Sequence, residues 1–167
     1  MKNIFLVIFI AFTFLSSCAK KDAECNSTDS AVVASATEIQ NVQNYLNTNN
    51  ITGTTQYPSG FFYKVTLAGS GAAVVNLCSK VTVKYVGKLT NGNVFDQNAA
   101  GVSFTLGGLI AGWQKGIPLI KSGGKITLYI PPSLGYGPND KRDPTTNNVI
   151  IPGNSILIFD IELVNVY

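Results

Sequence analysis

Histidine is absent from this chain of 167 residues. Its absence excludes Ser-His-Asp and Cys-His nucleophile pairs, and it also excludes zinc sites that contain histidine. The sequence has no GxGxxG and no GxxxxGK[ST] pattern, so the usual nucleotide-binding loops are missing. Only 12 Lys and Arg and 9 Asp and Glu are present, and the lysines are interleaved with apolar residues rather than gathered in a stripe. We therefore expect no binding to nucleic acid.

The first 18 residues have the pattern of an export signal. One positive charge, Lys2, is followed by an apolar run over residues 4–14, and the sequence "LSSC" then ends at Cys18. A run this short is typical of a signal-peptide core, because a helix that spans a bilayer needs about 20 residues. The "LSSC" sequence is similar to a bacterial lipobox, in which the cysteine becomes the lipidated first residue. We predict a lipoprotein signal peptide over residues 1–17 and lipidation of Cys18; the alternatives are an ordinary signal cleavage near Ser17 or a short membrane anchor.

Residues 18–34 are expected to be a lipidated tether, because the stretch "AKKDAECNSTD" that follows Cys18 is polar and charged. This organisation predicts a protein held by lipid in the cell envelope, outside the cytoplasm, and leaves open on which side of the membrane it lies. Cys25 and Cys78 would then meet an oxidising compartment, where they either pair or remain two free thiols. Two cysteines without histidine make a poor metal site, so we expect no metal.

A helix is predicted after the tether. Ser35 and Glu38 have the spacing of a capping box, in which each side chain satisfies a backbone N–H at the start of a helix. A helix of about 12 residues is indicated, because the apolar residues of one of its faces follow at helical spacing. They are Ile39, Val42, Tyr45 and Leu46. We expect a helix and linker over 35–56, with this face packed on the domain or, as the alternative, paired with a second copy.

From Tyr57 onward apolar residues alternate with polar ones, which is typical of strands with one buried face. The alternation is clearest over residues 61–67, 81–89 and 157–163. Residues 113–119 predict one short helix, and residues 135–148, rich in Gly, Pro and Asn, predict a long loop. The fold class expected for 57–167 is α+β, an antiparallel half-barrel sheet wrapped on one short helix and preceded by the N-terminal helix.

Three ordered stretches carry a family resemblance. They are VTVKYVGKLTNGNVFD, FTLGGLIAGWQKGIPLIKSGGKITLYIPPSLGYG and IIPGNSILIFDIELVNV. In order and spacing, over about residues 57–167, they resemble an FKBP-type peptidyl-prolyl cis-trans isomerase. The resemblance implies an FKBP-like fold and an enzyme that rotates X-Pro bonds in proline-containing polypeptides without a cofactor, assisting the folding of exported proteins. It also implies a pocket able to bind the macrolide inhibitors of the family.

The resemblance implies roles for individual residues of that pocket. Trp113 corresponds to the floor on which the prolyl ring lies. The backbone N–H of Ile110 and the hydroxyl of Tyr136 correspond to groups that bind carbonyl oxygens of the substrate. The walls correspond to Tyr85, Phe95, Asp96, Leu109, Ile151 and Phe159. Val102 stands where many relatives carry a second pocket phenylalanine, so that wall is expected to be smaller.

The chemistry of X-Pro isomerisation agrees with these residue types. The barrier of about 18–20 kcal/mol comes from amide resonance, and a dry aromatic pocket disfavours the planar, charge-separated amide relative to the twisted one. No nucleophile is needed, in keeping with the absence of histidine. The alternative function is a module that binds or chaperones proline-containing segments without significant turnover. Taken alone, Trp113 would be read as a core residue and Asp96 as an ordinary turn residue.

Overall fold

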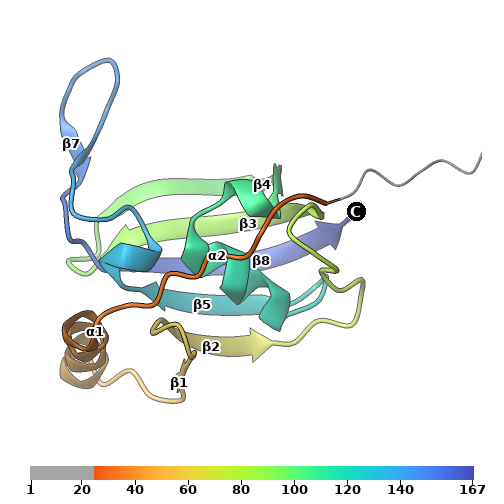
Figure 1. Ribbon diagram of the computed structural model, residues 1–167, viewed down its shortest axis with the longest axis horizontal. Helices are drawn as coiled ribbons and strands as arrows, with labels where there is room; N and C mark the ends of the chain where they lie inside the picture. Colours follow the sequence, from red (N-terminus) through yellow and green to blue (C-terminus); the bar gives the residue numbers. More distant parts are fainter. Residues whose placement is uncertain (1–24) are drawn as a thin grey trace, which may run out of the picture.

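The computed structural model describes residues 25–167 (Figure 1). The predicted signal peptide and Cys18 lie outside the described residues. Two sheets and two α-helices, with short 3-10 turns between them, make up the described part of the chain. None of the helices described there has the length and apolar character needed to cross a membrane.

The main sheet has six strands, and every neighbouring pair is antiparallel. The strands are β1 Thr55–Gln56, β2 Phe62–Leu67, β3 Lys80–Leu89, β4 Val94–Thr105, β5 Lys125–Ile130 and β8 Leu157–Val166. Their order in space is β1-β2-β5-β8-β3-β4, so the last strand of the chain lies inside the sheet. The predicted α+β class with an antiparallel sheet is confirmed, and the apolar alternation of β8 reflects one face packed on the core and one more open face.

One face of the sheet is covered by the short helix α2, Ala111–Gly116, and by the 3-10 turn η2, Ile117–Leu119 (Figure 1). Two glycines let α2 lie close to β5. A Cβ added at Gly112 would come within 2.6 Å of Ile130, and one added at Gly116 within 2.7 Å of Leu128. Carbon atoms do not tolerate such distances in a close-packed interior. The glycines that frame the only tryptophan are therefore required by the contact between helix and sheet.

The helix α1, Ala36–Thr48, packs against the opposite face of the sheet. Ser35 and Glu38 form the predicted capping box, and the helix begins where that box places it. The apolar face of α1 buries Val42 and Leu46 completely. Its partners on the sheet are Phe62, Tyr129 and Ile158. Packing on the domain is thus the arrangement that the structure shows for this face, over one end of the sheet only.

Residues 25–34, here called the strap, run across the side of the sheet that α2 covers (Figure 1). A disulfide joins Cys25 to Cys78, and the Asp29 carboxylate forms a 2.8 Å ion pair with the ammonium of Lys115 in α2. Ala34 is buried in the main core. The tether predicted over 18–34 therefore differs from the structure in its second half. The polar composition of this segment gave no sign of the contacts that hold the strap, which are the disulfide, the ion pair to Lys115 and the buried side chain of Ala34.

The predicted long loop contains a small hairpin. Strands β6, Lys141–Arg142, and β7, Val149–Ile151, pair in antiparallel fashion and project from one end of the domain (Figure 1). The turn of the hairpin is held by the Asp143 carboxylate, which accepts hydrogen bonds from the N–H groups of Thr145 and Thr146 at 2.8 and 2.7 Å. Local side-chain hydrogen bonds of this kind organise a polar segment without a core. Composition alone indicated a loop for that reason.

Candidate functional site

A small pocket opens between α2, the edge of the sheet formed by β3 and β4, and the loop that precedes the hairpin. Its volume is about 160 Å³. Eight residues line it: Tyr85, Asp96, Phe104, Leu109, Ile110, Trp113, Tyr136 and Phe159. Strands β3, β4 and β8 supply the aromatic walls because alternate residues of each strand point toward α2. Seven of the ten residues predicted for the pocket are brought together here.

Trp113 lies at the centre of this pocket and is only 4% exposed. The rings of Tyr85 and Phe159 meet the indole nearly at right angles, with ring centroids 5.2 and 5.0 Å away. The ring of Phe104 also meets the indole edge-on, with the ring centroids 6.3 Å apart. Edge-to-face contacts of this kind fix the orientation of aromatic rings. The indole is therefore held rigidly, with one part in the core and one part lining the pocket.

One polar pair stands in the wall of the pocket. The Tyr85 hydroxyl donates a 2.7 Å hydrogen bond to the Asp96 carboxylate. Burial, together with this hydrogen bond and the nearby charge of Asp96, raises the pKa of Tyr85 well above its usual range. Burial and the same carboxylate also raise the pKa of Tyr136. Both phenols are therefore protonated at neutral pH. The proton of Tyr85 is already donated to Asp96, so the Tyr136 hydroxyl is the one that can donate to a ligand.

The indole N–H of Trp113 is buried and has no partner in the described part of the chain, and two further donors of the pocket lack one. Ile110 is the residue before the first turn of α2, and its N–H donates to no group in the described part of the chain. The hydroxyl of Tyr136 has no hydrogen bond among the described side chains either, and its ring lies at the rim, with the Lys141 ammonium 5.7 Å from the ring centroid. Unpaired donors beside an apolar floor are suited to holding a carbonyl oxygen.

Three predicted residues do not line the pocket. Phe95 lies behind the wall, with its ring packed edge-on against Phe159 at 5.4 Å. Ile151 belongs to the buried core. Val102 pairs with Val83 across β3 and β4, on the far side of an irregularity in the register.

The aromatic residue that the prediction missed is Phe104, which stands two residues after Val102 on the same strand. The period-two alternation of β4 places both side chains on one face. This alternation along β4 was the signal that could have identified Phe104 as a pocket residue.

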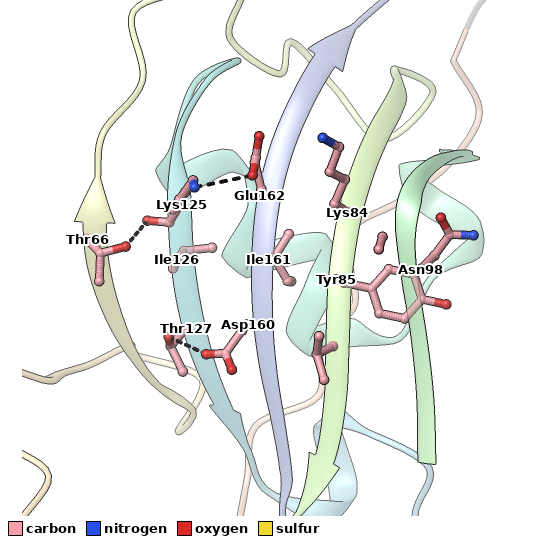
Figure 2. Close-up of a pocket in the computed structure, with 12 residues that line it drawn as sticks. Thr66, Lys84, Tyr85, Asn98, Lys125, Ile126, Thr127, Asp160, Ile161 and Glu162 are labelled. Carbon is pink, nitrogen blue, oxygen red and sulfur yellow. Dashed lines mark hydrogen bonds and ion pairs between the residues drawn. The ribbon is translucent and has the colours of Figure 1, made fainter. Parts of the chain in front are cut away.

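A larger hollow, about 470 Å³, lies elsewhere, on the open face of the sheet (Figure 2). Figure 2 shows Lys125 of β5 beside Glu162 of β8, and their ion pair measures 3.3 Å. The Asp160 carboxylate accepts hydrogen bonds from Thr127 at 2.8 Å and from Lys88 at 2.7 Å. These four charged groups pair with one another, whereas Lys84, which also lines the groove, has no ion pair among the described residues. The groove is an open, charged face of the sheet. The small aromatic pocket remains the candidate site.

Sequence comparisons show the family of the chain. Residues 72–164 match the family model described as FKBP-type peptidyl-prolyl cis-trans isomerase. An FKBP-type peptidyl-prolyl cis-trans isomerase FkpA from Buchnera aphidicola is 41% identical over 117 residues, which are 68% of this chain and 44% of that protein. FkpA from Escherichia coli is 41% identical over 111 residues, which are 65% of this chain and 38% of that protein. The chain therefore spans less than half the length of these curated relatives.

Solved structures resemble the fold as well. The crystal structure of FkpA from Escherichia coli has a TM-score of 0.65 and 36% sequence identity, and the match covers 78% of this chain and 60% of that chain. A peptidyl-prolyl cis-trans isomerase from Pseudomonas syringae has a TM-score of 0.65 and 26% identity, covering 83% of this chain and 98% of that chain. With a family model that matches more than half of its residues, this chain belongs to the FKBP-type peptidyl-prolyl cis-trans isomerase family.

Proposed function

We propose that this chain catalyses cis-trans rotation about X-Pro bonds in exported polypeptides. The observation that carries the proposal is the pocket around Trp113, which has a volume of about 160 Å³ and aromatic walls. A cavity of roughly 150 Å³ lined by apolar side chains is large enough to bind benzene. The pocket is accordingly suited to one five-membered prolyl ring and to little more.

The proposed mechanism uses desolvation and orientation. The prolyl ring lies on Trp113 while the N–H of Ile110 and the hydroxyl of Tyr136 hold carbonyl oxygens on either side of the bond. In the planar amide, resonance places partial charges on nitrogen and oxygen, and a dry aromatic site solvates these charges poorly. The twisted amide has lost that resonance and is penalised less. The hydrogen bond from Tyr85 fixes Asp96 in the wall, and the proposed mechanism requires no proton transfer.

A protease-coupled assay on a tetrapeptide with one proline tests this activity. The chain should speed the cis-to-trans step, and Trp113→Leu should lose most of the acceleration. Val164→Ser, on an exposed part of β8 that does not line the pocket, serves as the control and should keep the wild-type rate. Binding of the peptide without any acceleration would instead support the second candidate function, a module that binds proline-containing segments.

Macrolide inhibitors of the family are a proposed ligand class for the same pocket. Trp113 is the only tryptophan, so its fluorescence reports on the pocket alone. A saturating macrolide or proline peptide should change that fluorescence. Unchanged emission, with binding shown by calorimetry, would assign Trp113 to the core and not to the binding surface.

We propose further that the chain is a lipoprotein of the cell envelope, with a signal peptide over 1–17, lipid on Cys18, a tether up to the strap, and the isomerase domain over 57–167. The basis is the charged start, short apolar run and "LSSC" sequence. Cys18→Ala should release the protein from the membrane fraction. Cys25→Ala, which removes a nearby cysteine outside the "LSSC" sequence, should leave it there. Membrane retention of the Cys18→Ala variant would contradict the lipid anchor.

A further inference from the structure

The side chain of Gln114 reaches from α2 back to the loop that leads into this helix. Its amide nitrogen, Nε2, donates hydrogen bonds to the backbone carbonyls of Gly107 and Leu109, at 3.0 and 2.7 Å. Both acceptors are carbonyl oxygens, so the nitrogen end of the amide has to face them. Side chains of an α-helix lean toward its N-terminus, which brings Gln114 beside the residues that precede Ala111. The amide therefore fastens the loop to the first turn of α2.

The peptide unit that Gln114 holds is the one that carries the unpaired N–H of Ile110. The carbonyl of Leu109 and the N–H of Ile110 belong to this single unit, which is planar and trans. The two groups of a trans unit point in opposite directions. Because the carbonyl points toward Gln114, the N–H points away from it. Leu109 and Ile110 line the aromatic pocket, whereas Gln114 lines a separate hollow of about 240 Å³ beside the strap.

Two further observations indicate that the amide of Gln114 has a specific role. Ile110 is the N-cap of α2, and its apolar side chain makes no capping hydrogen bond, so the helix start lacks the usual Ser, Thr, Asp or Asn. The amide oxygen of Gln114, Oε1, is buried and has no partner among the described residues. Such an oxygen opposes folding. An apolar side chain of the same length would avoid this cost but would release the peptide unit.

We propose that Gln114 is a positioning residue of the isomerase site, which holds the Leu109 carbonyl and thereby directs the N–H of Ile110 at a carbonyl oxygen of the substrate. The proposal rests on the proposed function, in which this N–H binds the substrate. A hydrogen bond to the carbonyl of a peptide unit also polarises the unit, so its N–H becomes a better donor. Gln114 itself does not touch the substrate.

The expected contribution of Gln114 is to binding. The N–H of Ile110 holds a carbonyl oxygen in the planar and in the twisted amide alike, and loss of an interaction common to both states raises KM without changing kcat. Gln114→Met keeps the length of the side chain and removes both hydrogen bonds. KM for the tetrapeptide with one proline should rise about two- to tenfold, as loss of one neutral hydrogen bond would do, and kcat should stay near the wild-type value.

Gln40→Met is the matched control. Gln40 is exposed on α1, does not line the pocket, and its amide also donates a hydrogen bond, to Asn44 at 2.9 Å. The same chemical change at this position should leave KM and kcat as in the wild type.

Gln114→Glu separates positioning from a purely structural role. At neutral pH the new carboxylate has no proton to donate to the two carbonyl oxygens, whereas its protonated form has one. Burial beside those oxygens raises the pKa of this carboxyl. The charged groups that line the same hollow, Asp29 and Lys115, pair with each other and are present in the wild type as well. A pH effect confined to the variant therefore belongs to the new carboxyl.

Titration of ¹⁵N-labelled protein with the same tetrapeptide gives the Kd and the amide resonance of Ile110 in one experiment. In Gln114→Glu the Kd should be weakest near pH 8 and should approach the wild-type value as the pH falls to about 5.5, because protonation restores a donor. The Ile110 resonance of the free variant should move over the same pH range. Both quantities should stay constant in the wild type.

A wild-type KM in Gln114→Met, or a Kd of Gln114→Glu that does not change with pH, would overturn the proposal. A loss of stability with unchanged KM would do the same. If Gln114→Met does not fold, the pH series on Gln114→Glu decides alone. The two proposals can fail separately. Turnover by the wild type with KM unaffected in Gln114→Met keeps the proposed function and removes the role of Gln114. Peptide binding that weakens in the variant, without turnover by the wild type, keeps that role and favours the binding module.

Discussion

The two faces of the main sheet carry two hollows with different side chains. The pocket on the α2 side is small and aromatic, whereas the groove on the open side is about three times larger and is lined in part by charged side chains. Adjacent residues of β8 divide between them. Phe159 packs on Trp113 in the pocket, while Asp160 pairs with Lys88 in the groove. One strand therefore serves both faces, because successive side chains point to opposite sides.

The difference teaches that unpaired groups identify a site better than volume does. In the groove, Asp160 and Glu162 have partners within the sheet. In the pocket, the N–H of Ile110 and the hydroxyl of Tyr136 have none among the described residues. A donor left unpaired beside an apolar surface costs free energy unless water or a ligand satisfies it. Substrate binding can recover that cost in the pocket. In the groove, Asp160 and Glu162 already have partners, so binding there brings no such gain.

The largest expected effect is a difference in stability between substitutions at two adjacent residues of β8, one on each face of the sheet. Phe159→Ala should lower the free energy of unfolding by about 3–5 kcal/mol, because it opens a cavity in the aromatic cluster. Asp160→Ala should lower it by no more than about 1 kcal/mol, because its ion pair is partly exposed. Urea denaturation of both variants measures the difference.

Isomerase activity, measured on the same two variants, provides a second comparison of the two faces. Phe159→Ala should lose activity under conditions where it is still folded, and Asp160→Ala should keep it. Equal losses of activity in the two variants would mean that the groove takes part in function, and the contrast between the faces would have to be abandoned.

The strap adds covalent stability to the α2 side. Cys25 and Cys78 are separated by 53 residues, and closing a loop of this length stabilises a protein by about 4 kcal/mol in the chain-entropy model. Cys25→Ser together with Cys78→Ser should lower the free energy of unfolding by about that amount. Asp29→Asn, which removes the ion pair to Lys115, should cost less than loss of the disulfide, about 1.5–3 kcal/mol, because the Lys115 side chain is only 8% exposed.

Activity of the double serine variant should stay near the wild-type value, because neither cysteine lines the pocket. Wild-type protein with and without reductant should reproduce the stability difference. If reductant leaves the unfolding midpoint unchanged, the two thiols do not pair in solution.

A smaller effect is expected on the open face, where Glu38 connects α1 to the loop that leads to Tyr136. Its carboxylate accepts hydrogen bonds from the N–H groups of Ser35 and Ser133, at 2.9 and 2.8 Å. Partial burial opposes ionisation, but these hydrogen bonds outweigh it and lower the pKa of Glu38 below its ordinary value of 4.5. Glu38→Gln should cost about 1–2 kcal/mol at pH 7.

The sign of the pH dependence follows from the lowered pKa. A carboxylate with a lower pKa in the folded state stabilises the protein fully above pH 4.5 and loses this contribution as the pH falls through its folded value. The difference in urea midpoint between wild type and Glu38→Gln should therefore be constant above about pH 5.5 and shrink in acid. A difference that grows in acid would contradict this assignment.

Sequence patterns predicted the regular parts of the molecule well. The capping box of α1 and the alternation of β8 depend on short-range spacing, which is visible in the chain itself. Three features were missed. The strap needed Lys115 and Cys78 to hold it, and the hairpin needed Asp143 to organise its turn. Phe104 was missed although the alternation of β4 places it on the same face as Val102, because the family resemblance assigned that wall to Val102.

The smallest expected effect concerns the hydroxyl groups of the pocket, where the contrast with the charged groove is sharpest. Tyr136→Phe should reduce kcat/KM about two- to tenfold, because one neutral hydrogen bond contributes about 0.5–1.5 kcal/mol. The pKa values of Tyr85 and Tyr136 are both raised above 10, and the chain has no histidine. Neither phenol loses its proton between pH 6 and about pH 8, so kcat/KM should be flat over that range in wild type and variant alike.

A bell-shaped profile centred near pH 7 would show that a group in the pocket titrates during catalysis, which orientation and desolvation alone do not require. Complete loss of activity in Tyr136→Phe, with the fold intact by circular dichroism, would assign the hydroxyl an obligatory role in proton donation. Partial loss with a flat profile is the outcome expected of a neutral donor that holds a carbonyl oxygen. The same measurement on Lys125→Gln, in the groove, should return the wild-type rate, because that side chain pairs only with Glu162 on the far face of the sheet.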